Sequence, residues 1–108
     1  MSLRPVEFHV LLALAGDDLH GYAILQEVAR LTEGDLEIEP GTLYRALHRM
    51  LRDGWVVELS RRPAADMDDE RRRYYRLTAL GRRVAVAEAD RLSRLLSIAR
   101  AHKLLSRA

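Results

Sequence analysis

The chain has 108 residues, enough for one small domain with a modest core. With 48% hydrophobic and 31% charged residues it resembles an ordinary globular protein, and the absence of cysteine excludes a disulfide framework, a thiolate zinc site and a cysteine nucleophile. The net charge of +2 hides an asymmetry, because residues 1–39 carry two basic and eight acidic residues whereas residues 40–108 carry sixteen basic and eight acidic ones.

The first predicted element is a helix over about residues 4–15. Its apolar residues recur at helical spacing, and Pro5 suits a first turn, where the missing N–H is not needed. The apolar run Val10–Ala15 is far too short to cross a bilayer, and it lacks the basic flank and cleavage site of a signal peptide. We therefore expect a cytoplasmic protein that makes no contact with a membrane.

The second predicted element is a helix that follows a polar turn at Gly16–Tyr22. An inward row repeats at helical spacing from Ala23 to Leu31, and Gly34 is a plausible C-terminal stop. The next segment, Asp35–Glu39, alternates acidic and apolar residues. That alternation fits either a short extended segment or a loop.

A third helix is predicted to begin at Pro40 and to end before Gly54. Proline at the first helical position wastes no hydrogen bond, since that N–H would be unpaired anyway. Apolar residues from Leu43 to Leu51 fall on one face at helical spacing. The opposite face carries Arg45, His48, Arg49 and Arg52.

Two short strands are predicted next. The segments Trp55–Leu59 and Arg73–Leu77 are β-branched and aromatic runs of strand length, and the polar segment Ser60–Arg72 between them is too long for a tight turn. The pattern predicts a hairpin with a long tip. Because side chains alternate along a strand, Tyr74 and Tyr75 should point to opposite faces, with only one in the core.

The last predicted element is a long helix for which Thr78 is a good N-cap. Its apolar row is longer than the small domain can cover, and such a patch is normally used for association. A two-fold dimer is the simplest way to bury the row. In the alternative reading, the helix folds back over its own domain and the protein is a monomer. The row consists of Val84, Ala85, Ala89, Leu92, Leu95, Leu96 and Ala99.

This order of elements predicts a mainly α fold with a small β-hairpin, that is, a winged helix-turn-helix followed by a long C-terminal helix. We assign residues 1–78 to a winged-helix DNA-binding domain and residues 79–108 to a C-terminal dimerisation helix. At the start of the third helix, Gly41 leaves room for a duplex backbone, and Thr42 adds a hydroxyl to N–H groups that favour phosphate.

The basic residues are suited to DNA. Arg45, His48 and Arg49 would lie along base edges in the major groove, where arginine pairs bidentately with guanine. Arg71, Arg72 and Arg73 at the base of the hairpin would contact flanking phosphates or the minor groove. Arginine supplies 17 of the 18 basic side chains. Either bidentate recognition or a high GC content of the coding sequence explains that preference.

The sequence resembles the PadR family of bacterial transcriptional regulators, in the short form with a single C-terminal dimerisation helix. The resemblance covers about residues 4–81 and implies a winged-helix repressor that dimerises through its C-terminal helix and binds a palindromic operator. It also implies DNA contacts at Thr42, Tyr44 and Arg45 and at Arg71–Arg73 in the wing. It rests on four segments in family order and spacing: HGYAI (20–24), PGTLYRAL (40–47), DGWV (53–56) and RRRYYRLTALG (71–81).

Several alternatives stay open at this point. The arginines of the third helix and of the wing could form only a solvated face, and Tyr44 could be a core residue. A winged-helix module that binds an acidic protein partner is the competing function. The resemblance also leaves open a small-molecule effector, since some short relatives bind flat aromatic or drug-like molecules between the dimer's helices. Residues 78–108, however, contain no aromatic residue other than His102.

An enzyme is not expected. No two of the four histidines are four positions apart, as a helical metal site would need. No metalloprotease motif, Gly-rich phosphate loop or Ser-His-Asp arrangement can be found in the sequence. The sequence therefore predicts no metal and no cofactor. Double-stranded DNA and a second copy of the chain are the expected partners.

Overall fold

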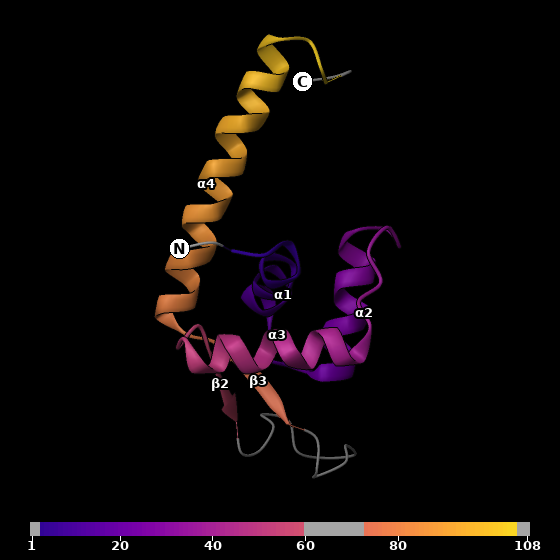
Figure 1. Ribbon diagram of the computed structural model, residues 1–108, viewed down its shortest axis with the longest axis vertical. Coiled ribbons are helices and arrows are strands. Elements are labelled where there is room, and N and C mark those ends of the chain that lie inside the picture. The colour runs from indigo at the N-terminus through magenta and orange to yellow at the C-terminus, as the bar shows by residue number, and fades with distance from the viewer. Residues whose placement is uncertain (1–2, 60–72, 106–108) are drawn as a thin grey trace.

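The computed structural model describes residues 3–59 and 73–105. Three helices form a compact body, a small sheet lies at one end of it, and a fourth helix leaves it (Figure 1). In chain order the elements are α1 (Pro5–Gly16), β1 (Leu19–His20), α2 (Gly21–Leu31), α3 (Pro40–Arg52), β2 (Val56–Leu59), β3 (Tyr74–Leu77) and α4 (Ala79–Ala101).

The core lies where the first three helices meet. Each contributes apolar side chains at helical spacing, among them Leu11 from α1, Ile24 from α2 and Leu47 from α3, all of them buried. Trp55 and Val56 close the core from the start of β2. Packing therefore fixes α3 along its inner face and leaves its outer face in solvent.

The sheet has three antiparallel strands in the order β1-β3-β2. The predicted hairpin of β2 and β3 is confirmed, but the two-residue strand β1 was not predicted, since it lies in a segment that reads as a polar turn. Here Leu19 pairs with Tyr75 and His20 with Tyr74. The predicted hairpin tip, residues 60–72, lies outside the described residues.

Tyr74 and Tyr75 are both buried, but they lie on opposite faces of β3 and only one of them belongs to the core cluster, as expected. Tyr75 belongs to the core cluster. Tyr74 lies on the other face of β3, where the His20 ring packs edge-on against it at a centroid distance of 5.2 Å. The added strand β1 thus supplies a neighbour for a side chain that an isolated hairpin would expose.

The ends of α3 follow the predicted signals. Pro40 occupies the first turn, and Gly54 adopts a φ of +80° just beyond the end of the helix, in the left-handed region that glycine enters freely. The segment before α3 has no regular structure. At the next junction, the Thr78 hydroxyl accepts a hydrogen bond from the Gly81 N–H and so caps α4 as predicted.

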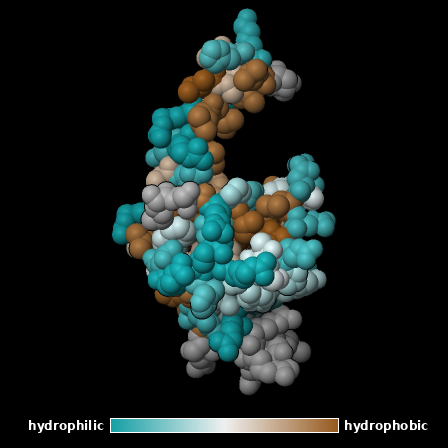
Figure 2. All heavy atoms as spheres, in the orientation of Figure 1, coloured by the Kyte–Doolittle hydropathy of each residue, from teal (hydrophilic) through white to brown (hydrophobic). Residues whose placement is uncertain are grey.

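Helix α4 has 23 residues and projects well beyond the body, which gives the molecule extents of 51 × 28 × 24 Å (Figure 1). Hydrophobic atoms are exposed along its distal part (Figure 2). The predicted fold class, a mainly α winged helix with a long C-terminal helix, is confirmed. Among residues 3–59 and 73–105, no helix has both the length and the apolar character needed to span a bilayer.

Candidate nucleic-acid interface

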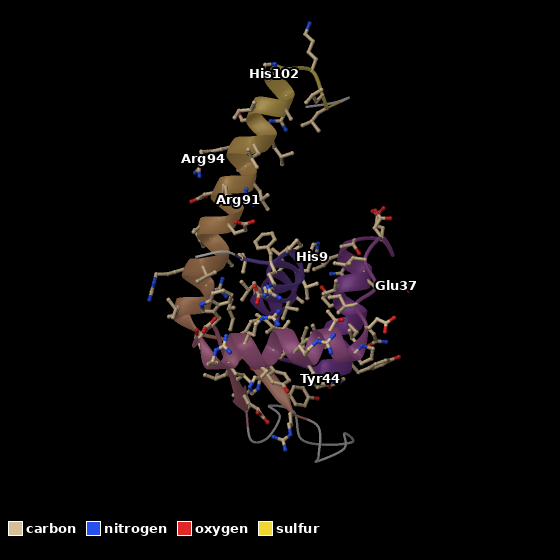
Figure 3. The ribbon with its side chains drawn as sticks, in the orientation of Figure 1. His9, Glu37, Tyr44, Arg91, Arg94 and His102 are labelled. Atoms are coloured by element: carbon tan, nitrogen blue, oxygen red, sulfur yellow. The ribbon has the colours of Figure 1, made fainter. Side chains whose placement is uncertain are left out.

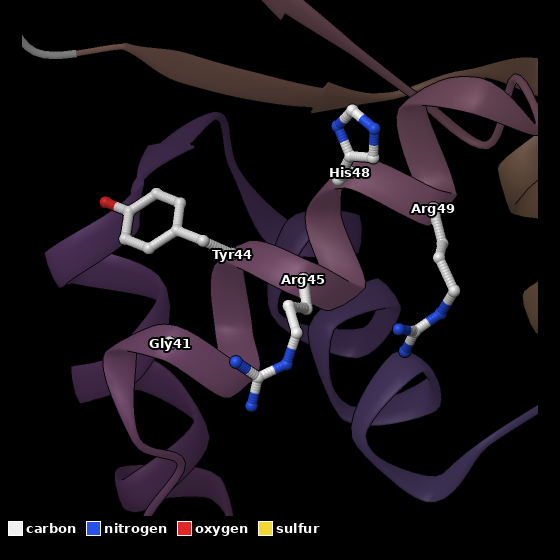
Figure 4. A pocket seen from close by; sticks show the side chains of 5 residues that line it. All are labelled: Gly41, Tyr44, Arg45, His48 and Arg49. Atoms are coloured by element: carbon white, nitrogen blue, oxygen red, sulfur yellow. The ribbon is translucent and has the colours of Figure 1, made fainter.

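The outer face of α3 presents a row of polar and aromatic side chains. Tyr44, Arg45 and His48 are exposed, whereas Leu43 and Leu47 on the inner face are buried. The exposed row lines a shallow depression of about 400 Å³ (Figure 4). The helical period has therefore sorted the segment into a core face and a face available to a partner.

At the start of α3, two groups predicted to approach a duplex lie together. Arg45 donates from Nη2 to the Thr42 hydroxyl at 3.3 Å. Gly41 is exposed, and a Cβ added there would meet only Arg45 Nη1, at 3.4 Å. A partner can thus approach the backbone of this first turn closely. Within the described parts of the chain, no carboxylate forms an ion pair with Arg45.

Tyr44 has an intermediate position that neither alternative from the sequence describes fully. Half of the side chain is exposed, and its hydroxyl end lies against Gly21 at the start of α2, where an added Cβ would come within 2.2 Å of the hydroxyl oxygen. Tyr44 therefore packs at the edge of the domain while part of its ring stays accessible. Tyr75 lies nearby, and its pKa is raised by burial and further by the charge on Glu58.

Arg49 is held differently from Arg45. Its Nε donates to Glu7 Oε2 on α1 at 3.1 Å, and only about a quarter of the side chain is exposed. In Figure 4 the Arg49 side chain points toward α1, away from His48. The sequence placed Arg49 with Arg45 on the solvent face, but the structure joins it to a carboxylate 42 positions earlier in the chain.

The base of the wing also contains an ion pair. Arg73 Nη1 lies 2.6 Å from Glu58 Oε2, so the residue that precedes β3 is linked to β2 across the hairpin. The hydrogen bond to Glu58 raises the pKa of Arg73 above its ordinary value. Arg73 is nevertheless exposed. The other predicted wing contacts, Arg71 and Arg72, lie outside the described residues.

The predicted dimerisation row divides along α4. Val84 and Ala85 pack against the chain's own core, so the proximal end of the row is already covered. Farther along the helix, Leu95 and Leu96 are each about half exposed, at 50% and 49%. Ile98, which is 55% exposed, extends this apolar surface and was not predicted. Leu92 and Ala99 are partly exposed, and Ala89 is exposed.

The two surfaces are far apart. Tyr44 on α3 lies toward one end of the long axis of the molecule, and His102 at the end of α4 lies toward the other (Figure 3). A second depression, of about 310 Å³, lies between Leu3 and the side chains of Val84 and Arg91 on α4. Among the described residues, no three His, Asp or Glu side chains gather as metal ligands would.

The three-helix body, the small antiparallel sheet and the exposed basic face of α3 define a winged-helix protein. Residues 10–87 match the transcriptional regulator PadR-like family, and the chain belongs to that family. It is therefore a transcriptional regulator and not an enzyme.

Individual relatives agree with this assignment. The chain is 34% identical to the transcriptional regulator Rv3488 of Mycobacterium tuberculosis over 90 residues. The aligned region covers 83% of this chain and 78% of that protein. A PadR family transcription regulator from Clostridium difficile R20291 superposes with a TM-score of 0.74 at 20% identity, over 90% of this chain and 96% of the other. Bacillus subtilis PadR, solved in complex with operator DNA, superposes with a TM-score of 0.65 at 16% identity, over 80% of this chain and 47% of the other.

Proposed function

We propose that the protein binds double-stranded DNA sequence-specifically through α3 and represses transcription as a homodimer on a palindromic operator. The observation that carries this proposal is the exposed row of Tyr44, Arg45 and His48 beside an accessible helix start at Gly41. Bacillus subtilis PadR, which has the same fold, was solved with operator DNA and supports this use of the fold. Such a role belongs in the cytoplasm, where bacterial DNA lies.

The side chains of α3 have different roles in this proposal. Thr42 and the N–H groups of the first turn bind a phosphate, which fixes the register of the protein on the duplex. Arg45 reads a guanine in the major groove, and His48 lies along the next base edges. Tyr44 contacts the DNA backbone with the exposed part of its ring. Recognition thus combines two contacts to the DNA backbone with a short row of base-reading side chains.

The wing adds contacts that do not depend on sequence. Arg71 and Arg72 bind flanking phosphates, and Arg73 contributes less because Glu58 already offsets its charge. In this arrangement, residues 1–78 form the DNA-binding domain and residues 79–108 form the dimerisation helix. A small-molecule effector is not part of the proposal.

A second copy of the chain is the partner proposed for distal α4. The exposed side chains Leu95, Leu96 and Ile98 lie where the helix has left the body, so the chain's own domain does not cover them. A two-fold axis lets one patch serve both subunits. It also presents two α3 helices to successive major grooves, spaced about 34–36 Å apart or a multiple of that distance, which explains the palindrome.

The test is a selection from a library of random duplexes with the unmodified protein, followed by titration of the enriched duplex and of a scrambled duplex. We expect an inverted repeat to be enriched and to bind about 10³-fold or more tightly than the scrambled duplex at physiological salt. Equal binding to both duplexes, even at low salt, would contradict the proposal. That result would favour the protein-interaction module instead.

A further inference from the structure

Glu7 is the one charged residue that is buried among residues 3–59 and 73–105. It lies in the first turn of α1, and only 5% of its surface is exposed. A buried carboxylate is costly unless its charge and its hydrogen-bonding capacity are both matched. Its partners therefore show what this unusual burial achieves.

Both carboxylate oxygens of Glu7 are used, and they connect different parts of the fold. Oε1 accepts a hydrogen bond from the Arg4 backbone N–H at 2.9 Å, which fixes the side chain at the start of α1. Oε2 accepts from Arg49 Nε at 3.1 Å. Arg49 lies one turn after Arg45 on α3, next to His48 in the exposed row. Glu7 therefore anchors the outer face of α3 to a different helix.

The inner face of α3 is held by apolar packing, which is not directional. Rotation of the helix about its axis is therefore opposed mainly by the shapes of the side chains packed against it. A hydrogen-bonded ion pair at the edge of the helix is directional and fixes that rotation. The angle at which Arg45 and His48 leave the body depends on the same rotation. The pair thus acts on the two side chains that the proposed function assigns to base reading.

We propose that Glu7 and Arg49 are positioning residues that set the orientation of α3 for DNA recognition, and that Arg49 itself does not read DNA. The inference rests on the proposed function, and it assigns opposite roles to two arginines on one helix. Arg45, which has no carboxylate partner in the described part of the chain, contacts the duplex. Arg49, which is paired with a buried carboxylate, keeps the helix in place.

The atom that makes the contact allows a sharp test. Glutamine places its amide nitrogen the same number of bonds from Cα as arginine places Nε, so Arg49→Gln keeps a donor for Glu7 but has no guanidinium terminus to reach DNA. Arg49→Met has similar length and no donor. Arg45→Gln is the matched control at the position assigned to base reading. Each variant is titrated with the duplex selected by the unmodified protein, at several salt concentrations.

We expect Arg49→Met to lose about tenfold or more in affinity, because orientation errors of this kind are costly. Arg49→Gln should lose less affinity than Arg49→Met, since its amide still donates a hydrogen bond to Glu7 although it no longer matches the charge of the carboxylate. Arg45→Gln loses affinity although it also has an amide. The salt slope stays at its original value in both Arg49 variants. A loss of affinity in Arg49→Gln equal to that in Arg49→Met, together with a flatter salt slope, would overturn the inference.

Glu7→Gln gives the opposite sign under the two accounts. If Glu7 positions α3, this variant weakens DNA binding; if Arg49 contacts DNA, releasing it from Glu7 leaves binding unchanged or strengthens it, which would count against the inference. A second readout needs no DNA. Amide hydrogen exchange along α3 should be faster in Arg49→Met than in Arg49→Gln, after correction for any difference in global stability. Equal exchange in the two variants would overturn the positioning role. If the unmodified protein binds no duplex selectively, the proposed function is refuted, and hydrogen exchange alone then tests whether the pair holds α3 in place.

Discussion

At the scale of single residues, three arginines differ in the group that each one meets. Arg45 donates a hydrogen bond to the Thr42 hydroxyl, Arg49 is paired with buried Glu7, and Arg73 is paired with Glu58 at the surface. The same side chain is thus left available, used to orient a helix, or partly neutralised. A count of basic residues in the second part of the chain therefore overestimates the charge that is free to meet DNA.

Gly81 provides the clearest stability prediction at this scale. An added Cβ would lie 2.0 Å from the Trp55 carbonyl oxygen and 2.9 Å from Leu77 Cδ1, so α4 approaches the start of β2 more closely than any side chain allows. Gly81→Ala should lower the free energy of unfolding by roughly 1–3 kcal/mol, because the obstacle is backbone and cannot rotate away. Urea denaturation measures the change.

Gly16→Ala is the matched control, since an added Cβ at Gly16 meets nothing within 4 Å. It should leave the free energy of unfolding within about 1 kcal/mol of its original value, on the stabilising side. If Gly81→Ala were as harmless as this control, the close approach of α4 to β2 would be wrong.

The residue scale is also where sequence reasoning was weakest. The helical period predicted which face of α3 carries Arg49, but its partner lies 42 positions away, and no local pattern connects them. The burial of Glu7 in a first turn gives no signal either, because acidic residues are common there for other reasons. Pairing across the fold appears only when the helices are packed together.

At the scale of elements, the helices were predictable because proline, glycine and threonine mark where they begin and end. Pro40 and Gly54 bound α3, and Thr78 caps α4, each for a local reason that the sequence contains. Strand β1 was missed because two residues are too few to show a period. On α4, Ile98 lay outside the predicted row because the exposed apolar surface is wider than one line of side chains.

The wing provides a prediction at the element scale. Each phosphate contact contributes about 0.9 to the slope of log K against log salt concentration, so Arg72→Ala should flatten that slope by roughly one. Arg73→Ala should flatten it less, since Glu58 lies 2.6 Å away and already balances part of the charge. Titrations at several salt concentrations, on selected and scrambled duplexes alike, measure the difference. Equal slopes for Arg72→Ala and the unmodified protein would argue against wing–phosphate contacts.

At the scale of the whole molecule, the structure is a small body with a projecting helix. The proposed DNA-reading surface on α3 and the apolar patch on distal α4 lie toward opposite ends of the long axis (Figure 3). A dimer built through α4 would therefore leave both α3 faces free. The distance between the two α3 helices would then depend on the length of α4. That length is about 35 Å, because the helix has 23 residues and rises by about 1.5 Å per residue.

The dimer leads to a prediction about assembly. Leu95→Asp combined with Leu96→Asp places two charges in the exposed patch and should give a monomer that keeps weak affinity for a half-site. Because these side chains are half exposed in the single chain, the fold itself should survive. Ser93→Asp with Ser97→Asp adds the same charge at exposed positions on another face of α4 and should stay dimeric. Sedimentation at micromolar concentration distinguishes the species, and a monomer in the unmodified protein would end the dimer proposal.

The central claim is that α3 reads bases, and the base preference of Arg45→Ala tests it most directly. The unmodified protein and the variant are titrated with the selected operator and with operators changed at one base pair at a time. We expect Arg45→Ala to cost about 1–3 kcal/mol on the operator and to lose discrimination at one base pair in each half-site, while preferences elsewhere persist. A variant that binds the operator as tightly as the unmodified protein, with every base preference intact, would contradict the account.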